Sequence, residues 1–475
     1  MFFILFIFLG FLFILLIRAI RFRPHPAPVP SGEPLVLPED KIIRDMQELL
    51  RCKTVSYDDV SLIDQKEFLK FQKLLPVLFP ELHKTCQQHF LGVNGIVYHW
   101  QGTSAGDPII LMSHYDVVPA EESQWEQPPF DAVLENGILW GRGTLDTKGT
   151  LLGIMEAAEF LIKEGYQPKR DLYFAFSGQE EVNGTTCASI VDWFEQQGIH
   201  PAMVLDEGGA VVENVFPGVP GECALIGIAE KGMANIEFHA KSRGGHASTP
   251  PVHTIVGELA QAAVNVEAHP FKRQLTKPVR EMLDTLGRHS SFLYKILFAN
   301  LWCFEGLFDM VCRRSGGELN AMLRTTCAIT RMESGKAFNV LPPKASMGMN
   351  LRLLGTDTVD SAKAYLEKVI RNPNIEVFVF EGRNPSTDSN TACAEWHMLC
   401  QTVADTWPKA LVSPYLMMAC SDSWHYCRIT DRVYKFSAMK LSTEERAMIH
   451  GNNERVPVDT LTKTVEFYIR LMKNC

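Results

Sequence analysis

The first residues whose types and spacing could do chemistry are His114 and Asp116, in the segment Ile-Ile-Leu-Met-Ser-His-Tyr-Asp at 109–116. Four apolar residues between turn-forming residues predict a buried strand of an α/β sheet, and open α/β sheets place their chemistry at the carboxyl ends of such strands. Side chains alternate along a strand, so His114 and Asp116 point the same way. The carboxylate can then take the second N–H of the imidazole and fix which nitrogen faces a metal. Taken alone, this pair also fits a hydrogen-bonded loop.

Further acidic side chains and a second histidine stand beyond other apolar or glycine-rich segments. They are Asp146 in the loop 140–149, Glu180 and Glu181 after 171–178, Asp206 after 202–205, and His450 near the C-terminus. Adjacent acids such as Glu180 and Glu181 repel each other unless cations hold them. Two histidines with four or more acids, each just beyond a strand-like segment, are typical of the ligands of a two-zinc hydrolase.

The motifs, in their order along the chain, resemble the zinc aminoacylase and carboxypeptidase family that includes acetylornithine deacetylase and carboxypeptidase G. Within it the chain is most similar to the branch of carboxypeptidase S and the N-fatty-acyl-amino-acid synthase/hydrolase. The resemblance covers nearly the whole chain from about residue 40. The motifs that carry it are His114-x-Asp116, Gly-Arg-Gly-x-x-Asp146-x-Lys-Gly, Glu180-Glu181, Asp206-Glu-Gly-Gly and His450-Gly.

The resemblance implies two zinc ions per chain, held in a defined way. Asp146 is expected to bridge them, with His114 and Asp206 completing one site and Glu181 and His450 completing the other. Cobalt or manganese could occupy the same ligand set. Glu180 is expected to take a proton from the attacking water and to return it to the leaving nitrogen.

The implied activity is cleavage of the amide bond of N-acyl amino acids or small peptides. A dipeptide-type carboxypeptidase remains an alternative. A second alternative, from another class, is a descendant of the family that has lost catalysis and serves as a membrane-tethered binding or scaffold protein.

From about residue 224 to 355, apolar residues alternate with period two, which predicts half-buried strands in an inserted α+β domain. The resemblance makes this insertion a lid and dimerisation domain, so the protein is expected to form homodimers. His246, in Ser-Arg-Gly-Gly-His-Ala-Ser, matches a lid histidine that reaches across the dimer to the substrate carbonyl; a solvated loop histidine is the alternative. Asn339 and Arg352 match substrate-contacting positions.

Two residues depart from the family pattern near the expected substrate. The sequence reads Ala419-Cys-Ser-Asp-Ser-Trp424, where relatives usually have Gly-x-Thr/Ser-Asp-Ser-Arg. Trp424 removes a candidate partner for a substrate carboxylate, and Ala419 can block a close approach of the backbone. Trp424 is otherwise interpreted as a packing residue.

The N-terminus carries an apolar segment followed by a proline-rich one. Residues 1–20 are long and apolar enough for a membrane anchor, and they lack the basic start and small-residue cleavage site of a signal peptide. Residues 21–38 form a stiff extended linker. The arginines after the anchor favour a cytoplasmic enzyme by the positive-inside rule, whereas the related branch works in a vacuole lumen or outside the cell, so the side of the membrane stays open.

The rest of the chain is predicted to form a discontinuous α/β catalytic domain, 39–223 and 356–475, with a central mixed sheet and helices on both faces. The formal net charge of −9 argues against nucleic acid as a partner. The twelve cysteines lack paired metal-type spacing and are interpreted as reduced core residues. The aromatic stretch 269–320 predicts helices packed on each other, or else an apolar wall for an acyl chain or a membrane-contacting surface.

Overall fold

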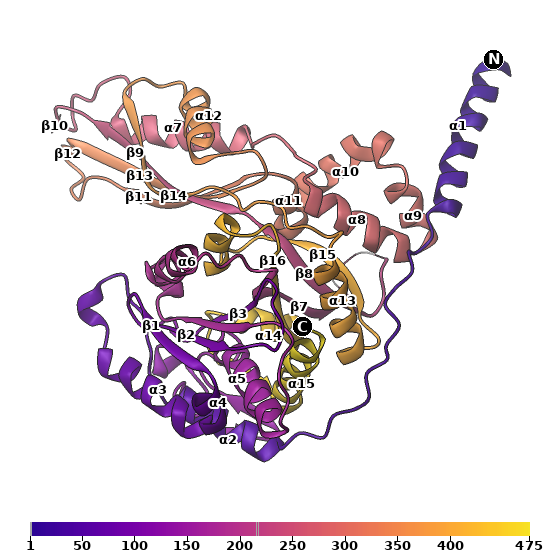
Figure 1. Ribbon diagram of the computed structural model, residues 1–475. Coiled ribbons are helices and arrows are strands. Elements are labelled where there is room, and N and C mark those ends of the chain that lie inside the picture. The colour runs from indigo at the N-terminus through magenta and orange to yellow at the C-terminus, as the bar shows by residue number, and fades with distance from the viewer. Residues whose placement is uncertain (1, 215, 217) are drawn as a thin grey trace.

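The computed structural model describes residues 2–214, 216 and 218–475, so Met1 of the expected anchor and residues 215 and 217 of the expected catalytic domain lie outside the described residues. Figure 1 shows an α/β body, a second α/β unit that projects from it, and a long N-terminal helix that stands out from both. The body holds the C-terminus and the carboxyl ends of the strands that the sequence marks as functional.

The body is built on an eight-stranded mixed sheet with the strand order β1-β2-β6-β3-β7-β16-β8-β15. β3 pairs in parallel with β6 and β7, whereas β2 pairs antiparallel with β6. The predicted α/β class with a central mixed sheet is therefore confirmed. The strands are β1 Gln87–Leu91, β2 Gly95–Trp100, β3 Ile109–His114, β6 Leu172–Ser177, β7 Met203–Glu213, β8 Glu222–Glu230, β15 Leu411–Met417 and β16 Val433–Leu441.

Helices cover both faces of this sheet, so its central strands carry apolar residues on both sides. In β3, Ile109 and Leu111 join the core formed with α5 and α15, while Ile110 and Met112 join a second core against α6. The helices of the body are α2 Glu39–Leu50, α3 Gln65–Leu78, α4 Pro80–Thr85, α5 Lys148–Lys163, α6 Thr186–Gln196, α13 Ala394–Thr406, α14 Thr443–Met448 and α15 Val458–Asn474.

Short elements complete the body around the edge where the functional strands end. They are the three-residue-per-turn helices η1 Val60–Leu62, η2 Glu122–Gln124, η3 Glu180–Val182 and η4 Asp422–Arg428, and a small sheet of β4 Leu134–Glu135, β5 Ile138–Trp140 and β17 Arg455–Pro457. β17 brings the segment after His450 beside β5, just before the loop that carries Asp146.

The projecting unit, called the lid below after the expected domain, is a four-stranded sheet in the order β11-β13-β9-β14 with α7 and α12 packed on it. Met347, Met349 and Leu351 of β13 are buried at every second position, as the period-two pattern predicts. Its elements are β9 Gly232–Lys241, α7 Ile255–Ala268, β11 Thr326–Glu333, β13 Lys344–Leu353, α12 Val359–Ile370 and β14 Ile375–Arg383, with β10 Gly245–His246 paired to β12 Val340–Leu341.

The limits of the lid differ from the predicted 224–355. β8 pairs with β15 in the body sheet, and β14 pairs with β9 in the lid sheet. The segment 277–323 belongs with the body, because Leu283 and Leu286 lie in the body core. Strands of the two sheets have similar alternation, so contacts between residues far apart in sequence decide which sheet each strand joins.

The N-terminal helix and the aromatic stretch lie next to each other on one side of the body (Figure 1). Among the described residues, Phe2–Arg21 is the one helix long and apolar enough to cross a membrane. The linker after it lacks helix and strand up to Pro38. The helices are α1 Phe2–Arg21, α8 Lys277–His289, α9 Phe292–Phe298, α10 Leu301–Ser315 and α11 Gly317–Leu323.

Candidate metal centre

The functional strands end at one edge of the body sheet, and this brings acids and histidines together. His114 is the last residue of β3, and Glu180 and Glu181 open η3 shortly after β6. Parallel neighbouring strands have their carboxyl ends at the same edge. The glycine-rich loop before α5 brings Asp146 to this edge, and the turn after α14 brings His450.

Asp146 lies between the two histidines. Its Oδ1 is 2.9 Å from Nε2 of His114, and its Oδ2 is 3.1 Å from Nε2 of His450. His450 Nε2 is also 2.9 Å from Oε2 of Glu181. One carboxylate therefore faces an imidazole on each side, which is the arrangement expected of a group shared by two cations.

The donor set fits divalent metal ions. Ligand atoms of His114, Asp146 and Glu181 lie within 4.8 Å of one another, and so do those of His114, Glu180 and Glu207. Imidazole nitrogen and carboxylate oxygen are ligands that zinc, cobalt and manganese accept. Crowded acids repel each other in a buried site, and cations relieve that repulsion.

Glu207, the neighbour of the predicted ligand Asp206, faces this cluster. Oε1 of Glu207 is 3.5 Å from Nε2 of His114, whereas the buried Asp206 carboxylate accepts the N–H of Ser423 at 3.2 Å. The two neighbours point in different directions because β7 bulges here. Lys435 and Phe436 of β16 pair with Asp206 and Gly209, which leaves Glu207 and Gly208 as extra residues. Bulges redirect side chains in this way beside active sites.

Asp116 holds the adjacent groups in place. Its fully buried carboxylate accepts the hydroxyl of Ser56 at 2.7 Å and the backbone N–H groups of Glu180 and Glu181, both at 3.2 Å. Nδ1 of His114 lies 3.0 Å from the backbone carbonyl of Asp116 and 3.5 Å from its carboxylate. The expected orientation of the imidazole thus comes mainly from the carbonyl, and the carboxylate positions the two glutamates.

Glu454, which the sequence did not single out, holds the loop that carries Asp146. Its buried carboxylate accepts the N–H of Gly143 at 3.0 Å and that of Leu145 at 2.8 Å, and it pairs with Arg142 at 2.8 Å. Gly143 has a φ of +94°, which favours glycine. The segment Gly141-Arg142-Gly143 before the acid is therefore a turn that binds a carboxylate, and the Asp146–Thr147 peptide after it is cis.

Replacing Glu454 with alanine is expected to lower the free energy of unfolding by about 3–5 kcal/mol, because Arg142 is left buried without its partner. The matched control is Glu444→Ala, which breaks an Arg–Glu pair of the same 2.8 Å length to Arg455 whose glutamate is 74% exposed. An exposed pair contributes about 1 kcal/mol or less. Denaturant unfolding of both variants tests this; equal losses would contradict it.

The acids of the cluster have altered proton affinities. Burial raises the pKa of Glu180 well above its usual value, against the nearby His114, and the negative charge of Glu207 adds to the rise. Hydrogen bonds to Asp146 and Glu181 raise the pKa of His450 to about 10. Oε2 of Glu180 is 4.0 Å from Nε2 of His114, so this carboxylate stands beside the metal-binding groups and can exchange a proton with a water held there.

The predicted lid residues do not join the cluster of their own chain. His246 is exposed in β10, and its Nδ1 lies 2.7 Å from the hydroxyl of Ser248. The backbone carbonyl of Asn339 accepts the N–H of Ala247 at 3.1 Å, which puts Asn339 next to His246. Both belong to the β10–β12 end of the lid, which Figure 1 shows at the far end of the projecting unit.

Trp424 packs against an arginine. Its indole N–H donates to the carbonyl of Asn384 at 3.0 Å, and the guanidinium of Arg383 lies 5.5 Å from the centre of its ring. Arg383 pairs with the buried Glu230 at 3.2 Å. The third predicted lid residue, Arg352, lies close by and donates to Sγ of Cys420 at 3.1 Å. Arg383 therefore lies beside Trp424, and Arg352 lies beside Cys420, four residues earlier in the chain.

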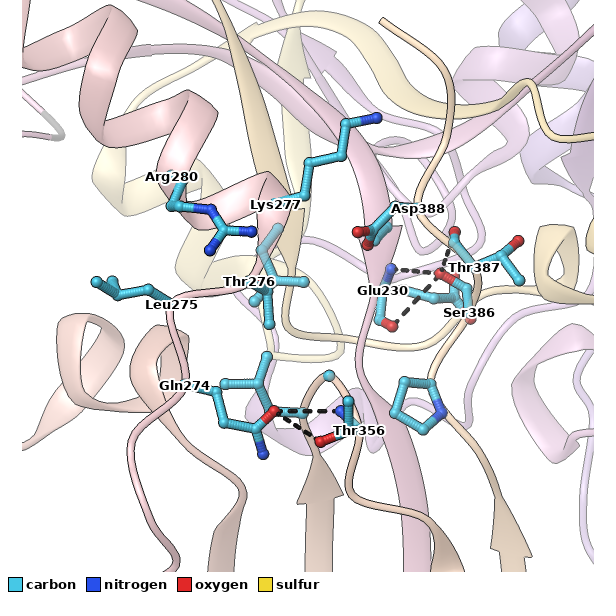
Figure 2. A pocket seen from close by; sticks show the side chains of 15 residues that line it. Glu230, Gln274, Leu275, Thr276, Lys277, Arg280, Thr356, Ser386, Thr387 and Asp388 are labelled. Atoms are coloured by element: carbon cyan, nitrogen blue, oxygen red, sulfur yellow. Dashed lines mark hydrogen bonds between the residues drawn. The ribbon is translucent and has the colours of Figure 1, made fainter.

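A cavity of about 550 Å³ lies where the chain passes between body and lid. Figure 2 shows Gln274 accepting two hydrogen bonds from Thr356, and Ser386 bound to the backbone of Glu230. The cavity is lined by parts of three crossing segments and the end of β8, and none of the residues that line it belongs to the metal-binding cluster. It is a feature of the junction between the domains and is separate from the candidate metal centre.

Comparison with known proteins places the chain in a family. Residues 110–474 match the family model described as peptidase family M20/M25/M40. The chain is 32% identical to a protein named probable carboxypeptidase S-like 2 of Dictyostelium discoideum, over 98% of this chain and 92% of that protein. It is also 32% identical to the N-fatty-acyl-amino acid synthase/hydrolase PM20D1 of Xenopus tropicalis, over 91% of this chain and 86% of that one.

Solved structures agree in fold. An M20 family metallo-carboxypeptidase, Sso-CP2 of Sulfolobus solfataricus, superposes with a TM-score of 0.67 at 16% identity, covering 92% of this chain and 99% of that one. A structure from Bacillus subtilis described as a dinuclear metal binding peptidase from the M20 family has a TM-score of 0.56 at 12% identity, covering 91% and 97%. The family resemblance and the enzyme class predicted from the motifs are confirmed, and with them an amide-bond hydrolase: the chain belongs to peptidase family M20/M25/M40.

Proposed function

We propose that the protein is a two-zinc hydrolase that cleaves the amide bond of N-acyl amino acids. The main support for a hydrolase is the cluster itself. Asp146 lies between two histidines, and the carboxylate of Glu180 lies beside them, where it is available for proton transfer. The substrate class is supported by relatives whose names give them as N-fatty-acyl-amino acid synthase/hydrolases, at 28–32% identity.

The residues that would hold the metals follow from these contacts. Asp146 would bind both ions, His114 and Glu207 would complete one site, and Glu181 and His450 the other. Two zinc ions, when bound, make a water molecule acidic enough to serve as a nucleophile near neutral pH and polarise the scissile carbonyl. This assignment keeps four of the five ligands predicted from the sequence and replaces Asp206 with Glu207.

Glu180 supplies the proton chemistry. Its carboxylate takes a proton from the attacking water and returns it to the nitrogen of the leaving amino acid, which must be neutral to depart. Asp116 accepts the backbone N–H groups of Glu180 and Glu181, and these hydrogen bonds fix the turn from which Glu180 projects. The carboxylate of Glu180 is therefore held in place. Such fixed orientation is what makes an acid–base group effective.

His246 is proposed to stabilise the oxyanion of the tetrahedral intermediate from the lid of a second chain. Within one chain it lies at the far end of the lid, exposed and outside the cluster. A lid that projects from the body, as in Figure 1, can reach the site of a neighbouring copy in a two-fold dimer. A hydrogen-bond donor at the oxyanion typically lowers the activation free energy by about 3 kcal/mol.

A mixture of two inactive variants is therefore expected to regain activity. His246→Ala chains lack the donor and Glu180→Gln chains lack the base, but a mixed dimer contains one site with both residues intact. Random pairing is expected to restore about a quarter of wild-type turnover. The variants are unfolded or dissociated together, reassembled and assayed. A mixture as inactive as its components would contradict a shared site.

Small peptides are the second candidate substrate, favoured by the carboxypeptidase S-like relative. Both substrate classes carry a carboxylate beside the scissile amide, and Arg352 and Arg383 are its proposed partners in place of the arginine that Trp424 replaces. Hydrolysis rates on N-acetyl amino acids, N-oleoyl amino acids and dipeptides decide between the classes. Faster cleavage of dipeptides than of any N-acyl amino acid would overturn the first choice.

We also propose that α1 anchors the enzyme in a membrane, on a side that stays open. The helix is 20 residues long, which corresponds to about 30 Å and matches a hydrocarbon core. The linker after it contacts the body at several points, among them Val29, whose carbonyl accepts from Gln401, and Ser31, whose N–H donates to Asp405. Alkaline extraction of membranes that contain the full chain tests the anchor: a retained chain supports it, and release would show a cleaved signal peptide or peripheral binding.

A further inference from the structure

The aromatic helices α9 and α10 are joined to α1 by specific contacts. Arg18 donates from Nε and Nη2 to the carbonyl of Ala299, at 3.1 and 3.0 Å. Asn300, which is fully buried, donates to the carbonyl of Leu15 at 3.1 Å. One turn further toward the N-terminus, the ring of Phe11 meets Trp302 edge to face, with centroids 6.2 Å apart. The end of α1 therefore packs on α9 and on the start of α10, and Figure 1 shows α1 reaching the body at α9.

These contacts fix the position of Trp302 along the axis of α1. From Arg18 to Phe11 is seven residues, or about 10 Å along a helix axis. The hydrocarbon core is about 30 Å thick, so a 20-residue helix must use nearly its whole length to cross it, with Arg18 and Arg21 at the boundary. If α1 crosses in this way, Trp302 lies inside the bilayer boundary marked by Arg18 and cannot remain in water.

The surface of α10 is suited to such a place. Trp302 is 59% exposed, and Leu307, Met310 and Val311 are also exposed, so the exposed side of the helix, called the stripe below, is broad and largely apolar up to Val311. The acids of this helix point elsewhere, since Glu305 pairs with Arg273 and Asp309 with Arg324. Exposed apolar patches of this kind mark binding to another molecule or to a membrane.

A basic end and an apolar hollow complete this surface. Arg313 and Arg314 follow the stripe at the last turn of α10 and are exposed, as suits contact with lipid headgroups. A cavity of about 250 Å³ opens between α9 and α10, lined by side chains such as Tyr294, Leu307 and Val311, almost all apolar. An amphipathic helix with aromatic and aliphatic residues on one face and arginine at its end lies in a membrane interface.

We propose that the stripe on α10, with the exposed end of α9, is a second membrane-binding element that sinks into the same leaflet that α1 enters. This inference rests on the proposed anchor. The bilayer lipid is the partner of this surface, and the two contacts together fix the orientation of the body relative to the membrane.

The test measures whether Trp302 touches acyl chains in the full-length protein. The chain is reconstituted in phosphatidylcholine vesicles whose acyl chains carry bromine, which quenches tryptophan on contact. The emission due to Trp302 is the difference between the wild type and Trp302→Phe. The control is Trp424→Phe, since Trp424 packs on Arg383 at the junction of body and lid. Trp302→Phe is expected to keep wild-type hydrolysis of the preferred substrate, and circular dichroism checks the fold of both variants.

The inference predicts that brominated lipid removes most of the Trp302 emission and little of the Trp424 emission. Unquenched Trp302 in vesicles that retain the protein after alkaline washing would overturn the second contact and leave the anchor in place. Vesicles that lose the protein on washing would overturn the anchor, and this inference with it. If Trp302 is unquenched while the vesicles retain the protein, another protein surface must cover the stripe. A change in the oligomeric state of the Leu307→Asp variant would then reveal that contact.

Discussion

Glu180→Gln is expected to bind its metals normally and to lose turnover by about 10²- to 10⁴-fold. Glutamine keeps the shape of the side chain but cannot accept a proton from the attacking water. The carboxylate stands beside His114 at 4.0 Å without being needed for the arrangement of Asp146 between the histidines. Steady-state kinetics with metal content measured on the same sample test this, and KM is expected to change little.

The matched control is Glu181→Gln, at the neighbouring position. Glu181 lies 2.9 Å from His450 and is proposed to bind a metal, so its loss should lower metal content as well as turnover. The two variants therefore separate the base from the ligand. If Glu180→Gln lost metal and Glu181→Gln kept it, the roles of the two glutamates would be exchanged.

Glu207→Ala is the second variant with a large expected effect. Removing a ligand should weaken one metal site by more than the 10- to 100-fold typical of an outer-shell change, so that about one metal per chain is lost and turnover falls with it. Asp206→Asn is expected to keep both metals, because the Asp206 carboxylate accepts the N–H of Ser423 away from His114.

Metal analysis after dialysis against a weak chelator distinguishes the two acids. Excess zinc should partly restore the turnover of Glu207→Ala, whereas Asp206→Asn should keep its turnover without added zinc. If Asp206→Asn lost a metal while Glu207→Ala retained both, the bulge in β7 would not decide the ligand, and the assignment first suggested by the sequence would stand.

Most of the site could be predicted from the sequence because it lies at strand ends. A continuous apolar segment such as 109–112 predicts a buried strand, and the residue after it is placed at the sheet edge by the fold alone. That reasoning located His114, Asp116, Glu180 and Glu181 correctly at one edge. It needed no knowledge of which strands are neighbours.

The parts that the sequence did not reveal depend on contacts between distant segments. The choice between Asp206 and Glu207 rests on a bulge against β16, more than two hundred residues later. The sequence did not single out Glu454, which is buried beside β17, where that strand pairs with β5. The extent of the lid likewise depends on β14 pairing with β9.

The aromatic stretch shows a different limit. Its composition predicted helices packed on each other or a membrane-contacting surface, and the structure shows helices that pack on each other and on α1 while leaving one face apolar. Sequence patterns cannot tell that Asn300 lies against Leu15, since the two residues are 285 positions apart. The depth proposed for Trp302 in the bilayer rests on that contact.

The most direct test of the central claim measures bound metal and hydrolysis on one preparation of the full-length protein. The account predicts about two zinc ions per chain and cleavage of N-acyl amino acids, both lost on removal of the metal and both restored by zinc. Glu180→Gln, metal-loaded and inactive, serves as the control for a contaminating hydrolase. Purified protein that binds no divalent metal, or that cleaves every substrate equally well after the metal is removed, would contradict it.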